Sequence, residues 1–288
     1  MSEVKSPGVS AGTVVVGVDG SAWSRTALNW AIGQAAIEHR ALTLVHAGAP
    51  SGDDQRHAVL DHACEEVRRQ APTLEVHRLT GSSDPSELLL ALSAQAALVV
   101  VGSRGFGPVR SLLLGSVGVA VTRRASCPVV VVRPSNPGLV RDGVLVGVDG
   151  SDRSRGALEF AFRQASLHRL PLTVLHTFID SIVYGARSGV PTPLMAEARE
   201  GDLEQERLAL SESLSGMQEK YPDVRLRSEL VRGVPGEALL QRARRMNLVV
   251  VGSHVGGAAA ELVLGSVTTF MVEHASCPVA VVPVGNGE

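Results

Sequence analysis

The stretch VVGVDGS at residues 15–21 decides the fold, because it returns 130 residues later as LVGVDGS at 145–151. Two further stretches recur 150 residues apart: LVVVGS at 98–103 returns at 248–253, and ASCPV at 125–129 returns at 275–279. A repeat of this length indicates two copies of one domain. The growth of the offset by 20 residues places an insertion in the second copy, between His176 and Gly233.

The repeat also predicts where the domains begin and end. Residues 133–138 read RPSNPG, and two prolines with a glycine are typical of a linker. We therefore expect a flexible N-terminus over 1–12, a first domain over 13–134, a linker over 135–141 and a second domain over 142–284.

Composition narrows the classes of function. The 288 residues carry 27 Lys and Arg against 29 Asp and Glu, for a formal charge of -2, and aromatic residues make up only 3%. Without a basic field or aromatic platforms, nucleic acid is a disfavoured partner. The apolar runs are far shorter than a membrane span, and the N-terminus lacks the apolar region of a secretion signal. With three cysteines and no disulfide pattern, we expect a cytoplasmic protein.

Within each copy, short Val/Leu/Ala-rich runs alternate with helix-period segments, which predicts an α/β fold with a doubly wound, five-stranded parallel sheet. Each expected strand is apolar on nearly every residue, as in a sheet covered by helices on both faces. In the first copy we expect strands near 13–19, 41–47, 74–79, 97–102 and 128–133, and helices near 22–38, 54–70, 85–95 and 115–125. In the second copy we expect strands near 143–149, 171–177, 224–231, 247–252 and 278–283.

Ligands of doubly wound sheets bind at the carboxyl ends of the strands, where the strand order reverses. The loop after the fourth strand has Gly102 and Gly105, then nine residues, then Gly115 and Ser116 at the start of a helix. Glycines let backbone amides approach an anion, and a helix start favours phosphate. A tight strand-to-helix turn is the alternative interpretation of this loop.

Other phosphate motifs are excluded by inspection. The chain has no Gly-Lys pair and so no P-loop, and the turn after the first strand lacks the GxGxxG spacing of a dinucleotide site. Asp19 follows that first strand, where a carboxylate can accept hydrogen bonds from a ribose or hold a metal through water. The alternative for Asp19 is a cap on the helix that begins around Ser21.

These motifs resemble the universal stress protein family over nearly all of residues 13–283. The resemblance rests on the VGVDGS start, on the Gly-x2-Gly-x9-Gly-Ser loop and on SCPV before the last strand. It implies strand order 3-2-1-4-5 in each copy, and pairing of the copies through 129–132 and 279–282 as an internal pseudo-dimer. In the family's nucleotide-binding branch, which has the glycine loop, ATP lies at the switch point, so the resemblance implies ATP together with Mg2+.

The resemblance assigns binding residues by motif. In the first copy Asp19 would meet the ribose or phosphates, the main chain around Gly17 and Ala47 would border adenine, and Gly102, Gly105, Gly115, Ser116 and Val117 would cradle the ribose and phosphates. The corresponding residues of the second copy are Gly147, Asp149, Thr177, Gly252, Ser253, Gly265, Ser266 and Val267. No catalytic residue is assigned, and the metal ligands are unknown.

The second copy departs from the loop pattern. Val255 stands where the first copy has Gly105, although Gly256 or Gly257 could take over by a shift of the loop. A β-branched residue resists positive φ and adds bulk near a phosphate, so we expect weaker binding in this copy. His254 replaces Arg104; if Arg104 contacts phosphate, the sites differ in affinity and pH response, and otherwise it is a solvated loop residue.

Three further features keep alternatives open. The insertion, which includes residues 178–184 and 191–193, lies on the adenine side and is either a lid or a surface loop. His46 and His176 end the second strands of the two copies, which favours a shared packing or backbone role over catalysis. Cys127 and Cys277 are expected to be buried small residues rather than redox sensors.

We expect a nucleotide-dependent stress-response regulator with no enzymatic activity beyond slow ATP hydrolysis, since the P-loop lysine is missing. One alternative is a nucleotide-dependent α/β enzyme, such as a transferase, or a flavoprotein-like carrier. Another is a structural module with vestigial glycine loops. Two chains could also associate as a homodimer, and the sequence identifies no protein partner.

Overall fold

The computed structural model describes residues 10–47, 53–82, 84–105, 114–133, 142–178, 198–253 and 265–284. The expected linker 135–141, nearly all of the N-terminal segment and residues 179–197 of the insertion lie outside this part. So do His254, Val255, Gly256 and Gly257, and the question of a shifted second loop therefore stays a prediction.

The first half alternates strands and helices as expected. Its strands are β1 Val14–Gly17, β2 Leu42–Ala47, β3 Val76–Gly81, β4 Leu98–Gly102 and β5 Val129–Val132. Its helices are α1 Ala22–Ile37, α2 Asp53–Gln70, α3 Pro85–Ser93 and α4 Ser116–Arg124. Pro85 lies in the first turn of α3, where a missing amide hydrogen costs no helical bond.

The second half repeats this order. Its strands are β6 Val144–Val148, β7 Leu172–Phe178, β8 Leu226–Arg232, β9 Leu248–Gly252 and β10 Val279–Val282. A 3-10 turn η1 at Asp152–Ser154 precedes α5 Arg155–His168, and the further helices are α7 Ala198–Leu214, α8 Met217–Lys220, α9 Pro235–Ala243 and α10 Ser266–His274. Pro235 repeats the role of Pro85.

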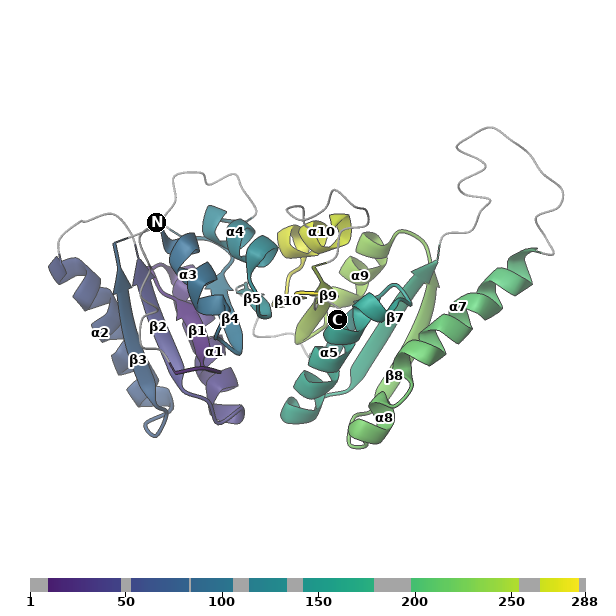
Figure 1. Ribbon diagram of the computed structural model, residues 1–288, viewed down its shortest axis with the longest axis horizontal. Helices are drawn as coiled ribbons and strands as arrows, with labels where there is room; N and C mark the ends of the chain where they lie inside the picture. The colour runs from purple at the N-terminus through teal and green to yellow at the C-terminus, as the bar shows by residue number, and fades with distance from the viewer. Residues whose placement is uncertain are drawn as a thin grey trace.

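The two halves form one ten-stranded sheet, ordered β3-β2-β1-β4-β5-β10-β9-β6-β7-β8. Strands pair in parallel within each half, and β5 pairs antiparallel with β10, with Val130 opposite Ala280. Figure 1 shows the halves side by side, with these two strands meeting in the middle. The α/β class, the strand order 3-2-1-4-5 and the internal pseudo-dimer are thus confirmed.

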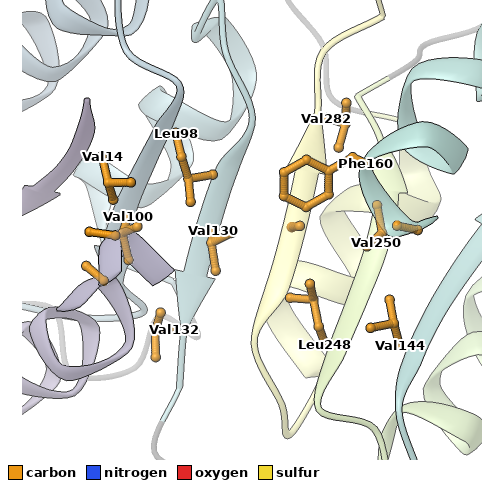
Figure 2. Packing of buried hydrophobic residues seen from close by; sticks show 14 of the residues in the cluster. Val14, Leu98, Val100, Val130, Val132, Val144, Phe160, Leu248, Val250 and Val282 are labelled. Carbon is orange, nitrogen blue, oxygen red and sulfur yellow. The ribbon is translucent and has the colours of Figure 1, made fainter. Parts of the chain in front are cut away.

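Buried side chains form two clusters, and each contains residues of both halves. Val14 and Val16 belong to one cluster while Val15 belongs to the other, because successive residues of a strand point to opposite faces. Figure 2 shows the first cluster on either side of the central pair, with Val130 in one half and Phe160 and Val282 in the other. Helices therefore cover both faces of the sheet.

The two outermost strands differ from the prediction of apolar strands. β3 reads VHRLTG and β8 reads LRSELVR, and both are only partly buried. They lie at the ends of the sheet, where one side has no neighbouring strand. Charged residues at such an edge oppose pairing with other chains, which explains the difference.

A polar contact between α1 and α5 accompanies the central strand pair. Gln34 and Gln164, which are equivalent in the two copies, are both 1% exposed. Glu38 accepts hydrogen bonds from Nε2 of Gln34 at 2.5 Å and from Nε2 of Gln164 at 3.4 Å. Nε2 of His168 donates to Oε1 of Gln34 at 3.1 Å, so the bonds cross from one half to the other.

Candidate functional site

The first part of the site is the turn that follows β1. The backbone amide of Ser21 donates to Oδ1 of Asp19 at 2.9 Å, and Gly20 between them has φ +87°. Ser21, not Asp19, is the N-cap of α1, since its Oγ accepts the amide hydrogen of Ser24 at 3.1 Å. The turn holds the Asp19 carboxylate, which is partly exposed, at the carboxyl edge of the sheet.

The glycine loop after β4 reaches this carboxylate. A Cβ atom added to Gly105 would lie 2.5 Å from Oδ2 of Asp19, so only glycine allows this close approach. A Cβ on Gly102 would lie 2.8 Å from the backbone oxygen of Trp23, at the start of α1. The spacing that the sequence singled out therefore reflects a loop packed against the Asp19 turn.

The end of the loop presents the start of α4. The amide of Gly115 donates to the backbone oxygen of Ser103 at 3.0 Å, which closes the loop beside its first residues. Gly115 is the N-cap of α4 and, having no side chain, cannot bond the amides of the first turn. Ser116 is exposed and Val117 partly exposed, so this helix start offers amides and a hydroxyl to an anion.

Arg104 is oriented by an aromatic side chain. Its guanidinium lies 5.3 Å from the centroid of the Trp23 ring, a cation–π contact. Its Nε is buried and has no hydrogen-bond partner in the part of the chain that the structure describes. Of the two interpretations of Arg104, the stacked position disfavours a solvated loop residue.

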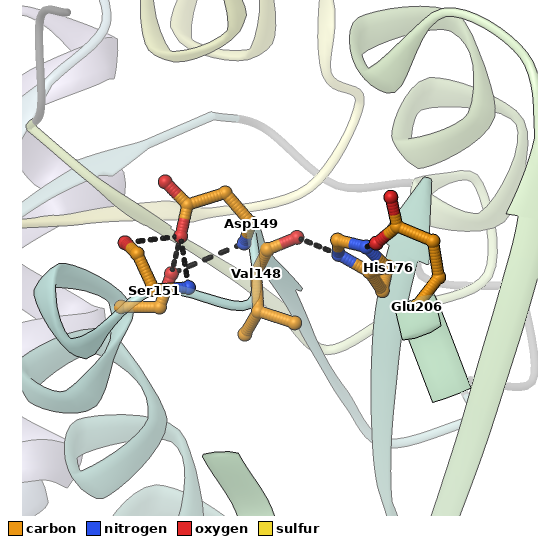
Figure 3. Close-up of polar contacts among 6 residues, drawn as sticks. Val148, Asp149, Ser151, His176 and Glu206 are labelled. Carbon is orange, nitrogen blue, oxygen red and sulfur yellow. Dashed lines mark hydrogen bonds and ion pairs between the residues drawn. The ribbon is translucent and has the colours of Figure 1, made fainter. Parts of the chain in front are cut away.

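The same turn in the second half is held through the carboxylate of Asp149. Oδ1 of Asp149 accepts the amide of Ser151 at 3.0 Å, the Ser151 hydroxyl at 2.7 Å and the Ser154 hydroxyl at 2.6 Å (Figure 3). Burial acts to raise the pKa of Asp149, but the bonds from Ser154 and Ser151 outweigh it, so the pKa is lowered. In the first half the equivalent Ser24 hydroxyl instead donates to the backbone oxygen of Ser21.

The paired histidines support these turns through the backbone. Nδ1 of His46 lies 2.6 Å from the carbonyl oxygen of Val18, and Nδ1 of His176 lies 3.0 Å from that of Val148. These carbonyls precede Asp19 and Asp149, so each histidine donates to the main chain at the site. Figure 3 also shows the contact between Nε2 of His176 and Oε2 of Glu206 in α7, at 2.5 Å. The expected backbone role is what the geometry shows.

The remaining predicted residues lie along the same strand ends. In the first half, β1 lies between β2 and β4, which brings the ends carrying Gly17, Ala47 and Gly102 together. In the second half, β6 lies between β7 and β9 in the same way, and Oγ1 of Thr268 donates to the oxygen of Gly252 at 2.6 Å. The second-half residues at these ends or at the start of α10 are Gly147, Thr177, Gly252, Ser253, Gly265, Ser266 and Val267.

Several contributing residues were not singled out from the sequence. Ser21 and Ser24 recur as Ser151 and Ser154, so a serine pair at the same offset as Asp19 was a signal that could have been used. Glu206 had no such signal, because it lies 30 residues from His176 and follows the insertion. Trp23 also gave no local indication of its contact with Arg104.

The thiols and possible metal ligands add two observations. Cys64, Cys127 and Cys277 are buried and form no disulfide; burial was expected for Cys127 and Cys277, and it raises the pKa of Cys127 to about 12. Among the described residues, no group of three His, Cys, Asp or Glu side chains could hold a metal ion.

No helix within the described ranges is long and apolar enough to cross a bilayer.

The fold and site define a tandem doubly wound α/β protein with a glycine loop between β4 and α4 of its first half. The model of the Universal stress protein family matches residues 11–133 and 141–283. A universal stress protein of Mycolicibacterium smegmatis is 34% identical over 290 residues, covering 93% of this chain and 96% of that protein. The chain belongs to the universal stress protein family.

A solved structure shows the same fold. A universal stress protein from Archaeoglobus fulgidus has a TM-score of 0.61 at 18% identity and covers 95% of this chain and 98% of its own. A solved universal stress protein in complex with cAMP is 30% identical and covers 43% of this chain and 98% of its own, with a TM-score of 0.37.

Proposed function

We propose that this protein binds ATP, with Mg2+, at the carboxyl ends of β1 and β4 and, more weakly, at those of β6 and β9, and acts as a nucleotide-dependent stress-response regulator. The observation that carries the proposal is the contact between Gly105 and Asp19, which brings the glycine loop to the carboxylate. Family membership supports it, since the glycine loop is typical of the family's nucleotide-binding branch.

Each element has a role in this proposal. The amides at the start of α4 and the Ser116 hydroxyl bind phosphate oxygens, which carry the negative charge that a helix start attracts. Asp19 accepts hydrogen bonds from the ribose or holds the metal through water. When bound, Mg2+ would neutralise part of the negative charge of the ATP phosphates. The chain's own residues bind and orient the nucleotide. The proposal includes a cytoplasmic location, which three buried cysteines outside any disulfide favour.

We expect the second half to bind nucleotide more weakly than the first. Oδ1 of its Asp149 carboxylate already accepts two hydroxyl bonds, from Ser151 and Ser154, so a ribose would compete with them for this oxygen. Gly265 and Ser266 nevertheless begin α10 as Gly115 and Ser116 begin α4. We therefore expect the first site to bind more tightly.

The test compares Gly105→Ala with Gly33→Ala. An alanine Cβ at position 105 would displace the Asp19 carboxylate, whereas the same Cβ at Gly33 in α1 would meet no described atom within 4 Å apart from its chain neighbours and the backbone of its own helix. Titration with Mg-ATP should show first-site affinity lowered at least about tenfold, or about 1.4 kcal/mol, by Gly105→Ala and unchanged by Gly33→Ala.

A second measurement identifies the ligand. The protein is purified without added nucleotide and denatured, and any released nucleotide is identified by chromatography and counted per chain. Adenine nucleotide at one or two per chain supports the proposal. Absence of released nucleotide together with absence of binding to Mg-ATP would overturn it and favour a structural module with vestigial loops.

A further inference from the structure

The helices that begin at the two glycine loops end differently. The last turn of α4 carries Arg123 and Arg124, whereas the equivalent positions of α10 are Glu273 and His274. The carboxyl end of a helix carries partial negative charge, so arginines stabilise it and a glutamate does not. Helix α10 therefore has no arginine of its own in this turn; its one basic residue there is His274, whose Nδ1 donates to the backbone oxygen of Phe270 at 2.9 Å.

An arginine from the other half occupies this place. Nη2 of Arg133 donates to the backbone oxygen of Val272 at 2.5 Å and to that of Glu273 at 2.7 Å. These are carbonyls of the last turn of α10, and Arg133 directly follows β5 in the first half. Charge-assisted bonds of this kind are stronger than those between neutral groups.

The arrangement runs in one direction only. The residue of the second half equivalent to Arg133 is Pro283, whose side chain has no charge and no donor. Proline at this position cannot return the contact to α4, which has its own arginines. The two halves are therefore complementary here rather than symmetric.

Arg133 also lies next to the glycine loop of the first half. The carbonyl oxygen of the preceding residue, Val132, accepts the amide of Ser103 at 3.0 Å. Burial lowers the pKa of Arg133, and the positive charge of Arg104 lowers it further, so the two guanidinium groups interact. The residue that contacts α10 is thus held by the backbone that forms the first site.

The opposite end of α10 begins the second glycine-loop site. The helix has nine residues, and its N-cap Gly265 has no side chain to bond the first-turn amides. Oγ1 of Thr268 ties this turn to the oxygen of Gly252 at 2.6 Å. A short helix held at both ends has little freedom to tilt, so a contact at its last turn also sets the position of its first.

We propose that Arg133 is a positioning residue for the second nucleotide site: from the first half of the chain it holds α10, whose amino end binds the phosphates. This inference rests on the proposed function. It means that the second site is complete only when the first half is docked on it.

The experiment isolates each site in the full chain. Ser116→Asp or Ser266→Asp places a carboxylate at a helix start, which favours the helix but repels phosphate, so each variant leaves one site open. Arg133→Met is added to both, and Mg-ATP affinity is measured by calorimetry. We expect Arg133→Met to weaken the second site about three- to tenfold and the first by less than about twofold.

Rescue separates positioning from general structural damage. Glu273→Arg gives α10 the cation that α4 has at the equivalent residue, Arg123, so Arg133→Met with Glu273→Arg should recover most of the second-site affinity. Arg133→Lys should recover part of it, since lysine keeps the charge but not the two-pronged geometry. Equal weakening of both sites, or failure of Glu273→Arg to rescue, would overturn the inference.

A readout without nucleotide keeps the two failures apart. Hydrogen exchange of the α10 amides in the ligand-free chain should become faster in Arg133→Met, while exchange in α4 stays as in the wild type. If the wild type binds no nucleotide, the proposed function fails. If the wild type binds nucleotide at both sites and Arg133→Met changes neither the second-site affinity nor the exchange of α10, only this inference fails. It also fails alone if the first site binds nucleotide and the second site does not.

Discussion

At the scale of single residues, the two serines that follow β4 and β9 have different environments. Ser103 is fully buried, and its Oγ has no hydrogen-bond partner in the described ranges. Oγ of the equivalent Ser253 accepts the amide of Val284 at 3.4 Å. The position equivalent to Val284 is Pro134, which has no amide hydrogen to donate. Among the residues that the structure describes, the first half therefore buries this hydroxyl without a hydrogen-bond partner.

This difference predicts opposite effects of one substitution. Ser103→Ala should leave the free energy of unfolding unchanged or raise it by up to about 1 kcal/mol, because it removes a buried polar group that makes no bond. Ser253→Ala should lower it by about 0.5–1 kcal/mol through the lost bond. Urea denaturation without nucleotide measures both, and a loss in Ser103→Ala as large as in Ser253→Ala would contradict the prediction.

The residues of the site were predictable in part. Asp19 and Gly115 stand out because they recur as Asp149 and Gly265, and Gly105 stands out through its spacing from Gly102 in the glycine loop. The partners that orient them, such as Glu206 for His176, lie far along the chain and have no spacing rule. Contacts between residues that are far apart in the sequence form only when the chain folds, so the sequence alone did not predict them.

At the scale of elements, substitutions at two glycines separate the effect of backbone conformation on stability from the effect of packing. A Cβ on Gly33 or on Gly216 would meet no atom within 4 Å, but Gly33 lies inside α1, whereas Gly216 precedes α8 with φ +75°. An L-residue fits the first conformation and is strained in the second. The two positions therefore differ only in backbone conformation.

We expect Gly33→Ala to raise the free energy of unfolding by about 0.5–1 kcal/mol, since alanine is the better helix former. Gly216→Ala should lower it by about 1 kcal/mol because its φ is positive. Thermal and urea denaturation of the two variants provide the comparison. A shift of the same sign in both variants would contradict this prediction.

The sequence predicted most elements closely, and its errors have a physical origin. Runs such as residues 98–102 are buried on both faces, so apolar content alone identifies them. The assumption of uniformly apolar strands was wrong for β3 and β8, because apolar content depends on whether a strand is central or outermost. Which strands are outermost depends on the strand order, and only the family resemblance predicted that order.

At the scale of the whole molecule, the contact between α1 and α5 makes stability depend on pH. Burial lowers the pKa of His168, while the nearby Glu38 carboxylate acts in the opposite direction. The unfolded chain therefore binds this proton more readily than the folded chain does. The stabilisation is present above the ordinary histidine pKa and is lost as the pH falls through it toward the lowered value.

We expect the urea midpoint to be lower at about pH 5.5 than at about pH 7.5, with His168 contributing less than about 1.4 kcal/mol per pH unit, the limit for one proton. His168→Gln keeps a donor for Gln34 and should reduce this dependence. His62→Gln, at a side chain that is 84% exposed, is the control and should leave it unchanged. Identical pH profiles for wild type and His168→Gln would rule out this origin.

The antiparallel pairing of β5 with β10 makes the association of the two halves independent of protein concentration. Because both strands belong to one chain, the halves meet at an effective concentration in the range of about millimolar, however dilute the protein is. Their contact surface does not have to supply the free energy of a bimolecular association. It can therefore contain buried polar groups such as Gln34 and Gln164, and it can carry Glu38 on one side and His168 on the other. Two identical subunits related by a twofold axis would have to carry the same residue on both sides.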